Sequence, residues 1–174
     1  MNKKKSKKVG ETIINYDLGA PVSNRVSIEN VRLINCNCFQ TPNAGGGKHL
    51  LAIDYDVKTQ TDKDKRFILV FPSFKLQAFP PEGKKEKPDL VIEATFVLIY
   101  KTESLEGLNQ SNFDAFGNTN GVYNAWPYWR EFVANTIARM NLPPLTIPVF
   151  RLLPAEKKSS RNKGTVKQLS NAKD

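Results

Sequence analysis

The sequence holds few side chains that could carry out catalysis. Its one histidine, His49, follows a glycine-rich stretch, and its two cysteines, Cys36 and Cys38, lie shortly before that stretch. A cysteine nucleophile needs a neighbour that lowers the pKa of the thiol, and a histidine across a loop could supply it. No acidic residue is placed to orient the histidine. A structural role for His49 is therefore favoured, and the sequence predicts neither an enzyme nor a catalytic residue.

Two further patterns could bind ions. The run Gly45–Lys48 is similar to part of a phosphate-binding loop, but it lacks the leading glycine, and His49 stands where a serine or threonine would follow the lysine. Asp54 and Asp56 would project from the same face of a strand. Carboxylates at alternate positions of an exposed strand face are usually solvated and bind no ion. Two cysteines and one histidine supply at most three zinc ligands. The sequence therefore predicts no metal and no cofactor.

The positive charge of the chain is concentrated at its two ends. The 174 residues carry a formal net charge of +9. Residues 1–12 hold five lysines and one glutamate, and residues 155–174 hold six basic and two acidic residues, so only +1 remains for residues 13–154. A hydrophobic fraction of 40% is typical of a globular domain. We therefore expect a basic flexible lead-in over 1–19, one domain over 20–153 and a disordered basic tail over 154–174.

The sequence also bears on location. The opening MNKKKSKK is not followed by the apolar run of a secretory signal, and no run approaches the roughly 18 apolar residues of a membrane span. Two cysteines are too few for a disulfide framework. These features predict a cytoplasmic protein with reduced cysteines and no membrane span.

Four segments have the alternation of β-strands. We expect strands over 26–39, 50–58, 66–79 and 89–101. A change of phase at Glu29–Asn30 predicts a β-bulge, and Pro72 predicts an edge strand or a bulge because proline cannot donate to a ladder. The last strand is apolar on both faces, so we expect a neighbouring subunit to cover the second face.

A helix follows the strands. Its predicted start is at Asn124 as N-cap, with Pro127 in the first turn, and its predicted end is at Asn141 in the left-handed conformation. One face carries apolar residues at three- and four-residue steps: Trp126, Trp129, Phe132, Val133, Ile137 and Met140. Four strands followed by a long helix predict an α+β fold, with a four-stranded antiparallel sheet and the helix on one face.

Two surfaces near the helix have two interpretations each. The stripe Glu131, Ala134 and Ala138 either faces solvent or packs on a second helix, for example from another subunit. The segment 142–150, which we call the strap, is apolar and stiffened by three prolines. It either covers the domain's own core or lines a groove for another chain.

The helix and strap carry a resemblance to a known family. The run Pro127-Tyr128-x-Arg130-Glu131, then Arg139, then Leu142-Pro143-Pro144-Leu145-Thr146-Ile147-Pro148 resembles the SecB-type export chaperones. The resemblance covers most of 26–150. It implies a homo-oligomer, a dimer or tetramer, that holds unfolded polypeptide without ATP.

The resemblance also implies positions for the sites. Many aromatic residues lie near the loop 40–49 and the strap, which also suits the binding of apolar peptides. Together with the resemblance, this predicts a peptide-binding groove with the residues Phe39, Leu142, Leu145, Ile147 and Phe150. The loop 40–49 would border the same groove. The predicted oligomer interface consists of Pro127, Tyr128, Glu131, Ala134 and Ala138.

The chain departs from the family in charge. Members that deliver clients to the SecA translocase motor are strongly acidic, whereas residues 13–154 are nearly neutral and the C-terminal end is basic. The sequence therefore allows two interpretations of the client: exported proteins in general, or one dedicated client such as an antitoxin. A nucleic-acid- or ribosome-associated module using the basic ends is the alternative function. No interleaving of aromatic and basic residues within the domain favours it.

Overall fold

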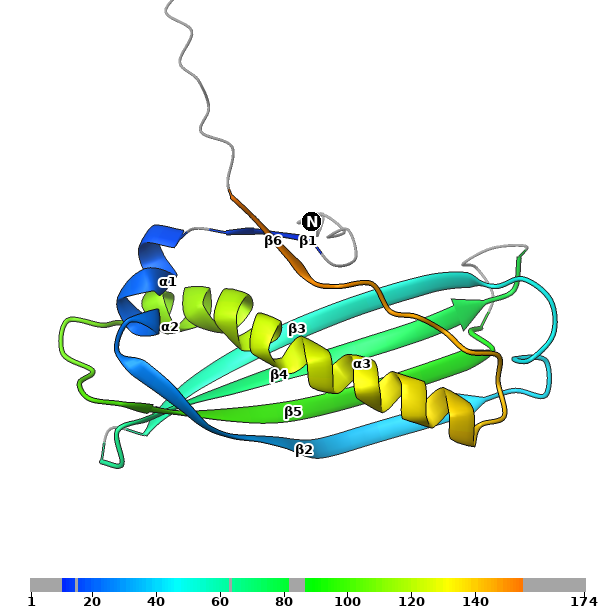
Figure 1. Cartoon of the computed structure of the whole chain (residues 1–174), viewed down its shortest axis with the longest axis horizontal. Coiled ribbons are helices and arrows are strands. Elements are labelled where there is room, and N and C mark those ends of the chain that lie inside the picture. The colour runs from blue at the N-terminus through cyan, green and yellow to red at the C-terminus, as the bar shows by residue number, and fades with distance from the viewer. Residues whose placement is uncertain (1–10, 15, 63, 82–86, 155–174) are drawn as a thin grey trace, which may run out of the picture.

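The computed structural model describes residues 11–14, 16–62, 64–81 and 87–154 (Figure 1). Along the chain it forms β1 (Glu11–Ile14), α1 (Tyr16–Ser23), β2 (Val26–Gln40), β3 (Leu50–Asp62), β4 (Phe67–Phe79), β5 (Leu90–Thr102), α2 (Gln110–Phe116), the π-helical segment η1 (Gly117–Gly121), α3 (Val122–Arg139) and β6 (Arg151–Pro154). The four long strands form one antiparallel sheet, and α3 lies across one of its faces. The predicted α+β fold is confirmed.

The order of strands in the sheet is β2-β5-β4-β3, so β4 and β5 are central and β2 and β3 are the edges. The predicted bulge is present, since the register of β2 against β5 shifts between Ile28 and Asn30. A second shift, between Leu33 and Asn35, was not predicted. These two irregularities change which side chains of β2 face the helix.

The prediction for Pro72 is wrong. β4 lies between β3 and β5, and Pro72 is paired with Val57 on the β3 side. On the β5 side the ladder stops after Val70 and resumes at Ser73 in unchanged register. The missing N–H of Pro72 is thus accommodated by a local gap in one ladder, without a bulge or an edge position.

The helix begins earlier than predicted. Asn109 caps α2 by accepting from the backbone N–H groups of Ser111 and Asn112, and α2, η1 and α3 then follow one another without a break. Asn124 lies within the helix, and its side-chain amide donates to the Tyr100 hydroxyl at 3.0 Å. The predicted end is confirmed, because Asn141 has a φ of 56°.

Two glycines allow the helical segment before α3 to pass close to the sheet. A Cβ atom at Gly121 would lie 2.6 Å from Val70 Cγ1, and one at Gly117 would collide with Thr59 Cγ2. The π-helical segment therefore approaches β3 and β4 more closely than a side chain would allow.

The core lies between α3 and the two central strands. Phe74 of β4 stacks on Trp129, with ring centroids 5.4 Å apart, and meets Trp126 edge-on at 5.6 Å. The apolar face predicted for the helix is the buried one, with Trp126, Trp129, Val133 and Ile137 all in the core.

Regular secondary structure is present before residue 20. β1 pairs in parallel with β6, which brings residues 11–14 beside 151–154, and the predicted domain boundary at residue 20 falls inside α1. α1 packs on α2, where the Asn112 side chain donates to the Leu18 carbonyl at 3.0 Å. Residues 1–10 and 155–174 of the predicted tails lie outside the described residues. In the part of the chain that is described, no helix has the length and apolar character needed to cross a membrane.

Candidate functional site

The strap after α3 packs back onto the domain. The indole N–H of Trp126 donates to the Pro148 carbonyl at 2.9 Å, and the ring of Phe150 lies 5.1 Å from Trp126 and 5.8 Å from Tyr55 of β3. Ile147 and Phe150 are only 3% and 6% exposed. For these two residues of the predicted groove, the strap covers the domain's own core.

The remaining apolar residues of the strap are more accessible. Leu142 and Leu145 are half-buried and pack against the edge of the core, while Val149 is exposed. An incoming chain could therefore contact the strap at Leu142, Leu145 and Val149 without any rearrangement of the core. Val149 was not among the predicted residues, because alternation along a proline-rich segment does not show which side is outward.

Phe39 lies apart from the strap. It is 52% exposed and pairs with Val91 of β5. The preceding pair, Cys38 with Ile92, faces α3, since Ile92 belongs to the core. Successive side chains of a strand leave opposite faces, so Phe39 points away from the helix. The five predicted groove residues are thus divided between core, strap surface and the helix-free face of the sheet.

The predicted interface residues share the outer side of α3. Pro127, Tyr128, Glu131, Ala134 and Ala138 are all exposed. Their exposure leaves this surface available to a second subunit, and its use as an interface stays a prediction.

A hollow between α3 and β2 was missed by sequence reasoning. It has a volume of about 220 Å³ and is lined by Val31 and Leu33 of β2, Phe96 of β5, and Tyr128 and Phe132 of α3, with the polar side chains Glu131, Asn135 and Arg139 also present. The apolar alternation of 31 and 33 was the available signal. It did not show that the helix leaves this edge of the sheet uncovered.

Comparison with known proteins gives one informative similarity. No protein-family model and no curated protein matches the sequence. The structure matches the Mycobacterium tuberculosis SecB-like chaperone Rv1957, solved in complex with a ChAD peptide from the HigA1 antitoxin Rv1956, with a TM-score of 0.66 and 20% identity. The match covers 78% of this chain and 95% of that one. This chain has a SecB-like fold.

A second solved structure, a protein of unknown function from Streptococcus agalactiae, is 9% identical with a TM-score of 0.35, over 71% of this chain and 96% of that one. That similarity is too weak to support an argument.

On the SecB-like fold, the candidate catalytic residues have other partners. The structure pairs His49 with Asp89, with 3.3 Å between Nε2 and Oδ2. Cys38 faces α3, where Thr136 is a hydrogen-bond partner, and burial raises the pKa of its thiol above the ordinary value of 9.0. A raised pKa lowers the fraction of reactive thiolate at neutral pH. The surroundings of Cys38 therefore do not activate its thiol.

The helix-free face of the sheet carries a hollow of about 340 Å³ with charged side chains among those that line it. Asp54, Asp56, Lys75 and Glu93 line it. Lys75 lies 2.7 Å from Glu93, and its hydrogen bond, with a second one from Asn37, holds the pKa of Glu93 below its ordinary value. Within the described ranges, no group of three or more histidine, cysteine, aspartate or glutamate side chains is arranged to hold a metal ion.

Proposed function

We propose that this chain is an ATP-independent chaperone, a holdase that binds unfolded or extended polypeptide. The SecB-like fold supports the proposal, and so does the peptide held by the mycobacterial chaperone of the same fold. The observation that carries it is the number of large apolar side chains that this single chain leaves exposed: Leu18, Ile28, Leu33, Ile34, Phe39, Leu50, Leu51, Tyr123, Tyr128 and Val149.

The placement of these residues suits an extended client. Four of them lie on β2, an edge strand of 15 residues whose outer side is unpaired within the sheet. An extended peptide can add to such an edge through backbone hydrogen bonds, which do not depend on its sequence. Exposed apolar side chains then contribute affinity without requiring an exact fit.

The clients are either exported proteins or one dedicated partner such as an antitoxin. The near-neutral charge of residues 13–154 favours the dedicated partner, because an acidic surface for the translocase motor is not evident in the sequence. The protein acts in the cytoplasm as a homo-oligomer, a dimer or tetramer, joined in part through the exposed side of α3.

The proposal is tested with the full-length protein and a thermally unfolded client enzyme. We expect suppression of light scattering at stoichiometric amounts of chaperone, equal with and without ATP. A variant with Ile28→Ser and Ile34→Ser should suppress scattering about tenfold less well while keeping its circular dichroism spectrum. Solution mass measured on the same samples gives the oligomeric state.

Two results would contradict the proposal. One is a folded wild-type protein that neither suppresses aggregation nor binds apolar peptides. The other is binding to RNA that falls steeply with salt, together with no peptide binding, which would favour the alternative of a nucleic-acid module.

A further inference from the structure

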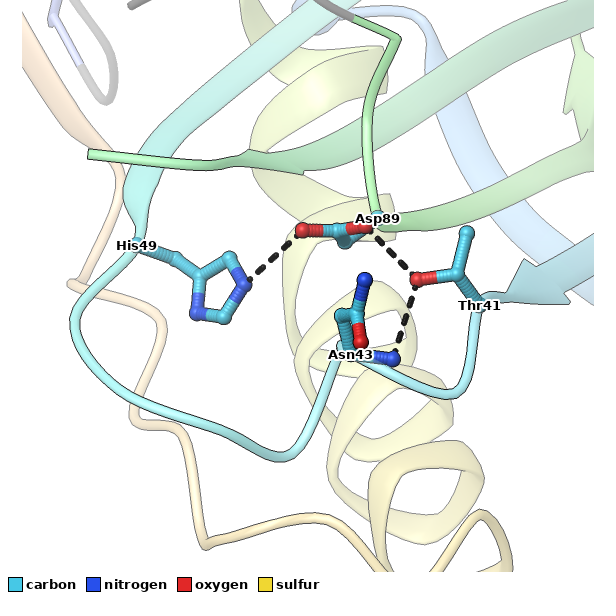
Figure 2. Close-up of polar contacts among 4 residues, drawn as sticks. All are labelled: Thr41, Asn43, His49 and Asp89. Atoms are coloured by element: carbon cyan, nitrogen blue, oxygen red, sulfur yellow. Dashed lines mark hydrogen bonds and ion pairs between the residues drawn. The ribbon is translucent and has the colours of Figure 1, made fainter. Parts of the chain in front are cut away.

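A single carboxylate holds both ends of the loop that joins β2 and β3. The backbone N–H of Thr41 donates to the Asp89 carbonyl at 2.8 Å, and the Thr41 hydroxyl donates to Asp89 Oδ1 at 2.6 Å. At the other end of the loop, His49 Nε2 lies 3.3 Å from Asp89 Oδ2. Figure 2 shows Asp89 between the two residues, with the loop running around them.

These contacts are largely shielded from water. The side chains of His49 and Asp89 are 12% and 13% exposed. Both carboxylate oxygens of Asp89 are engaged, as a poorly hydrated charge requires. The first turn of the loop is built on the same threonine, because the N–H of Asn43 donates to the Thr41 hydroxyl and that of Ala44 to the Thr41 carbonyl.

The other side of the loop contacts the end of α3 and the start of the strap. The side-chain amide of Gln40 donates to the Met140 carbonyl at 3.3 Å. A Cβ atom at Gly45 would lie 3.6 Å from Leu142 Cδ2, so the loop backbone is close to the strap. Ala44 and Leu142 both pack against the edge of the core. The loop therefore connects Asp89, at the beginning of β5, with the accessible part of the strap.

We propose that Asp89 is a positioning residue that clamps loop 41–49 against the strap and thereby sets how fast a client enters and leaves this surface. The inference rests on the proposed function, since it assigns a regulatory role beside the same strap. Two charge-assisted contacts at one carboxylate close a glycine-rich loop, and Leu142 becomes more accessible when the loop moves away.

The clamp is tested first without any client. In Asp89→Asn, which keeps the shape but removes the charge, hydrogen exchange at the amides of Ala44 and Gly46 should increase about tenfold, because opening no longer breaks charge-assisted bonds. Thr41→Val should produce part of this increase, and Thr41→Ser, which keeps the hydroxyl, should match the wild type. Exchange in β5 serves as the control for the fold and should not change.

A matched control variant is Asp62→Asn. Asp62 accepts from the N–H of Lys65 in an exposed turn and pairs with the Lys65 side chain, at the opposite end of β3 from loop 41–49. This variant should leave exchange at Ala44 and Gly46 unchanged. Equal exchange in wild type and Asp89→Asn would overturn the clamp.

The effect on clients is tested by stopped-flow binding of a fluorescent extended apolar peptide. In Asp89→Asn, association and dissociation should both accelerate severalfold, with a smaller change in Kd, whereas Thr41→Ser should keep the wild-type rates. Unchanged peptide rates with faster exchange would overturn the regulatory inference and leave the proposed function intact. A wild-type protein that binds no peptide would refute the proposed function and the kinetic inference together, whereas the exchange data would still decide on the clamp.

Discussion

β5 and β2 pair along their whole length, yet their side chains have opposite environments. β5 lies in the centre of the sheet, and its residues facing α3, from Leu90 to Tyr100, are all buried. β2 lies at the edge, and 13 of its 15 positions are exposed. At one pair of the ladder, Phe96 of β5 is 4% exposed and Leu33 of β2 is 44% exposed.

The difference shows how this chain divides its apolar residues between two tasks. α3 and the strap cover β5, β4 and part of β3 (Figure 1). α3 also meets the end of β2, where Thr136 is a hydrogen-bond partner of Cys38 and Gln40 donates to the Met140 carbonyl, but most of β2 stays exposed. Apolar residues on the central strands therefore stabilise the fold of the single chain. On β2, Val26 and Val31 pack against the core, whereas Ile28, Leu33, Ile34 and Phe39 are exposed and contribute less to the fold of the single chain. The proposed binding of clients depends on these exposed residues.

The largest expected effect comes from changing the two members of that pair. Phe96→Ala removes a buried ring beside Phe74, whose ring centroid is 6.2 Å away, and should lower the free energy of unfolding by about 3 kcal/mol or more. Leu33→Ala should cost less than about 1 kcal/mol, because its side chain is already largely in water. Urea denaturation of both variants makes the comparison, and equal losses would refute the division of tasks.

A somewhat smaller loss is expected where the helix meets β4. Gly121→Ala introduces a methyl group 2.6 Å from Val70 Cγ1, which should destabilise the protein by about 1–3 kcal/mol. In a Val70→Ala background the loss caused by Gly121→Ala should be smaller, because the clash is removed. A double-mutant cycle measures the coupling, and simple additivity would show that the close approach is not limiting.

At alkaline pH, the buried strand should lose stability in a defined window. Burial raises the pKa of Tyr100 to about 12, partly opposed by the hydrogen bond from Asn124. The folded state therefore disfavours the phenolate, so stability is complete below the ordinary pKa near 10 and decreases as the pH rises towards 12. We expect the free energy of unfolding, measured by urea denaturation from about pH 9 to about pH 12, to decrease less steeply with pH in Tyr100→Phe than in the wild type.

The smallest expected effect is on the helix-free face, where β5 and β2 are linked by Glu93 and Asn37. The pKa of Glu93 is below its ordinary value of 4.5, so its contribution is present at neutral pH and is lost as the pH falls through the lowered value. Lys75 and Glu93 are 41% and 35% exposed, so screening by water limits the effect to below about 1 kcal/mol. Glu93→Gln should remove this acid dependence in pH-dependent urea denaturation, and an unchanged profile would contradict the assignment.

Local patterns were sufficient for much of the fold. The four strands, the bulge after Ile28, the buried face of α3 and its end at Asn141 all follow from periodicity or from single-residue preferences. The start of the helix did not, because Asn124 is a good N-cap by type, whereas in the structure Asn109 caps α2 and the helical segment continues past Gly117 and Gly121, which lie against the sheet. The gap in the ladder at Pro72 could not be predicted either, because it depends on β4 lying between β3 and β5, and strand order is not visible in the local sequence.

The candidate site was less predictable for the same reason. Phe39 and Phe150 are both large aromatic residues near loops, but the pleat places Phe39 on the helix-free face and the strap places Phe150 in the core. Asp89 has no pattern around it that distinguishes it from other aspartates. Its role follows from the meeting of Thr41, His49 and Asp89 in space.

The sequence by itself determined the four long strands, the main helix that follows them and the concentration of positive charge at the two ends, because these depend on spacing and composition along the chain. It did not show β1, α1, α2, η1 or β6. Only the tertiary structure decided which apolar residues are covered. Burial depends on strand order and on the path of the helix and strap, and these place β5 at the centre and leave β2 at an open edge.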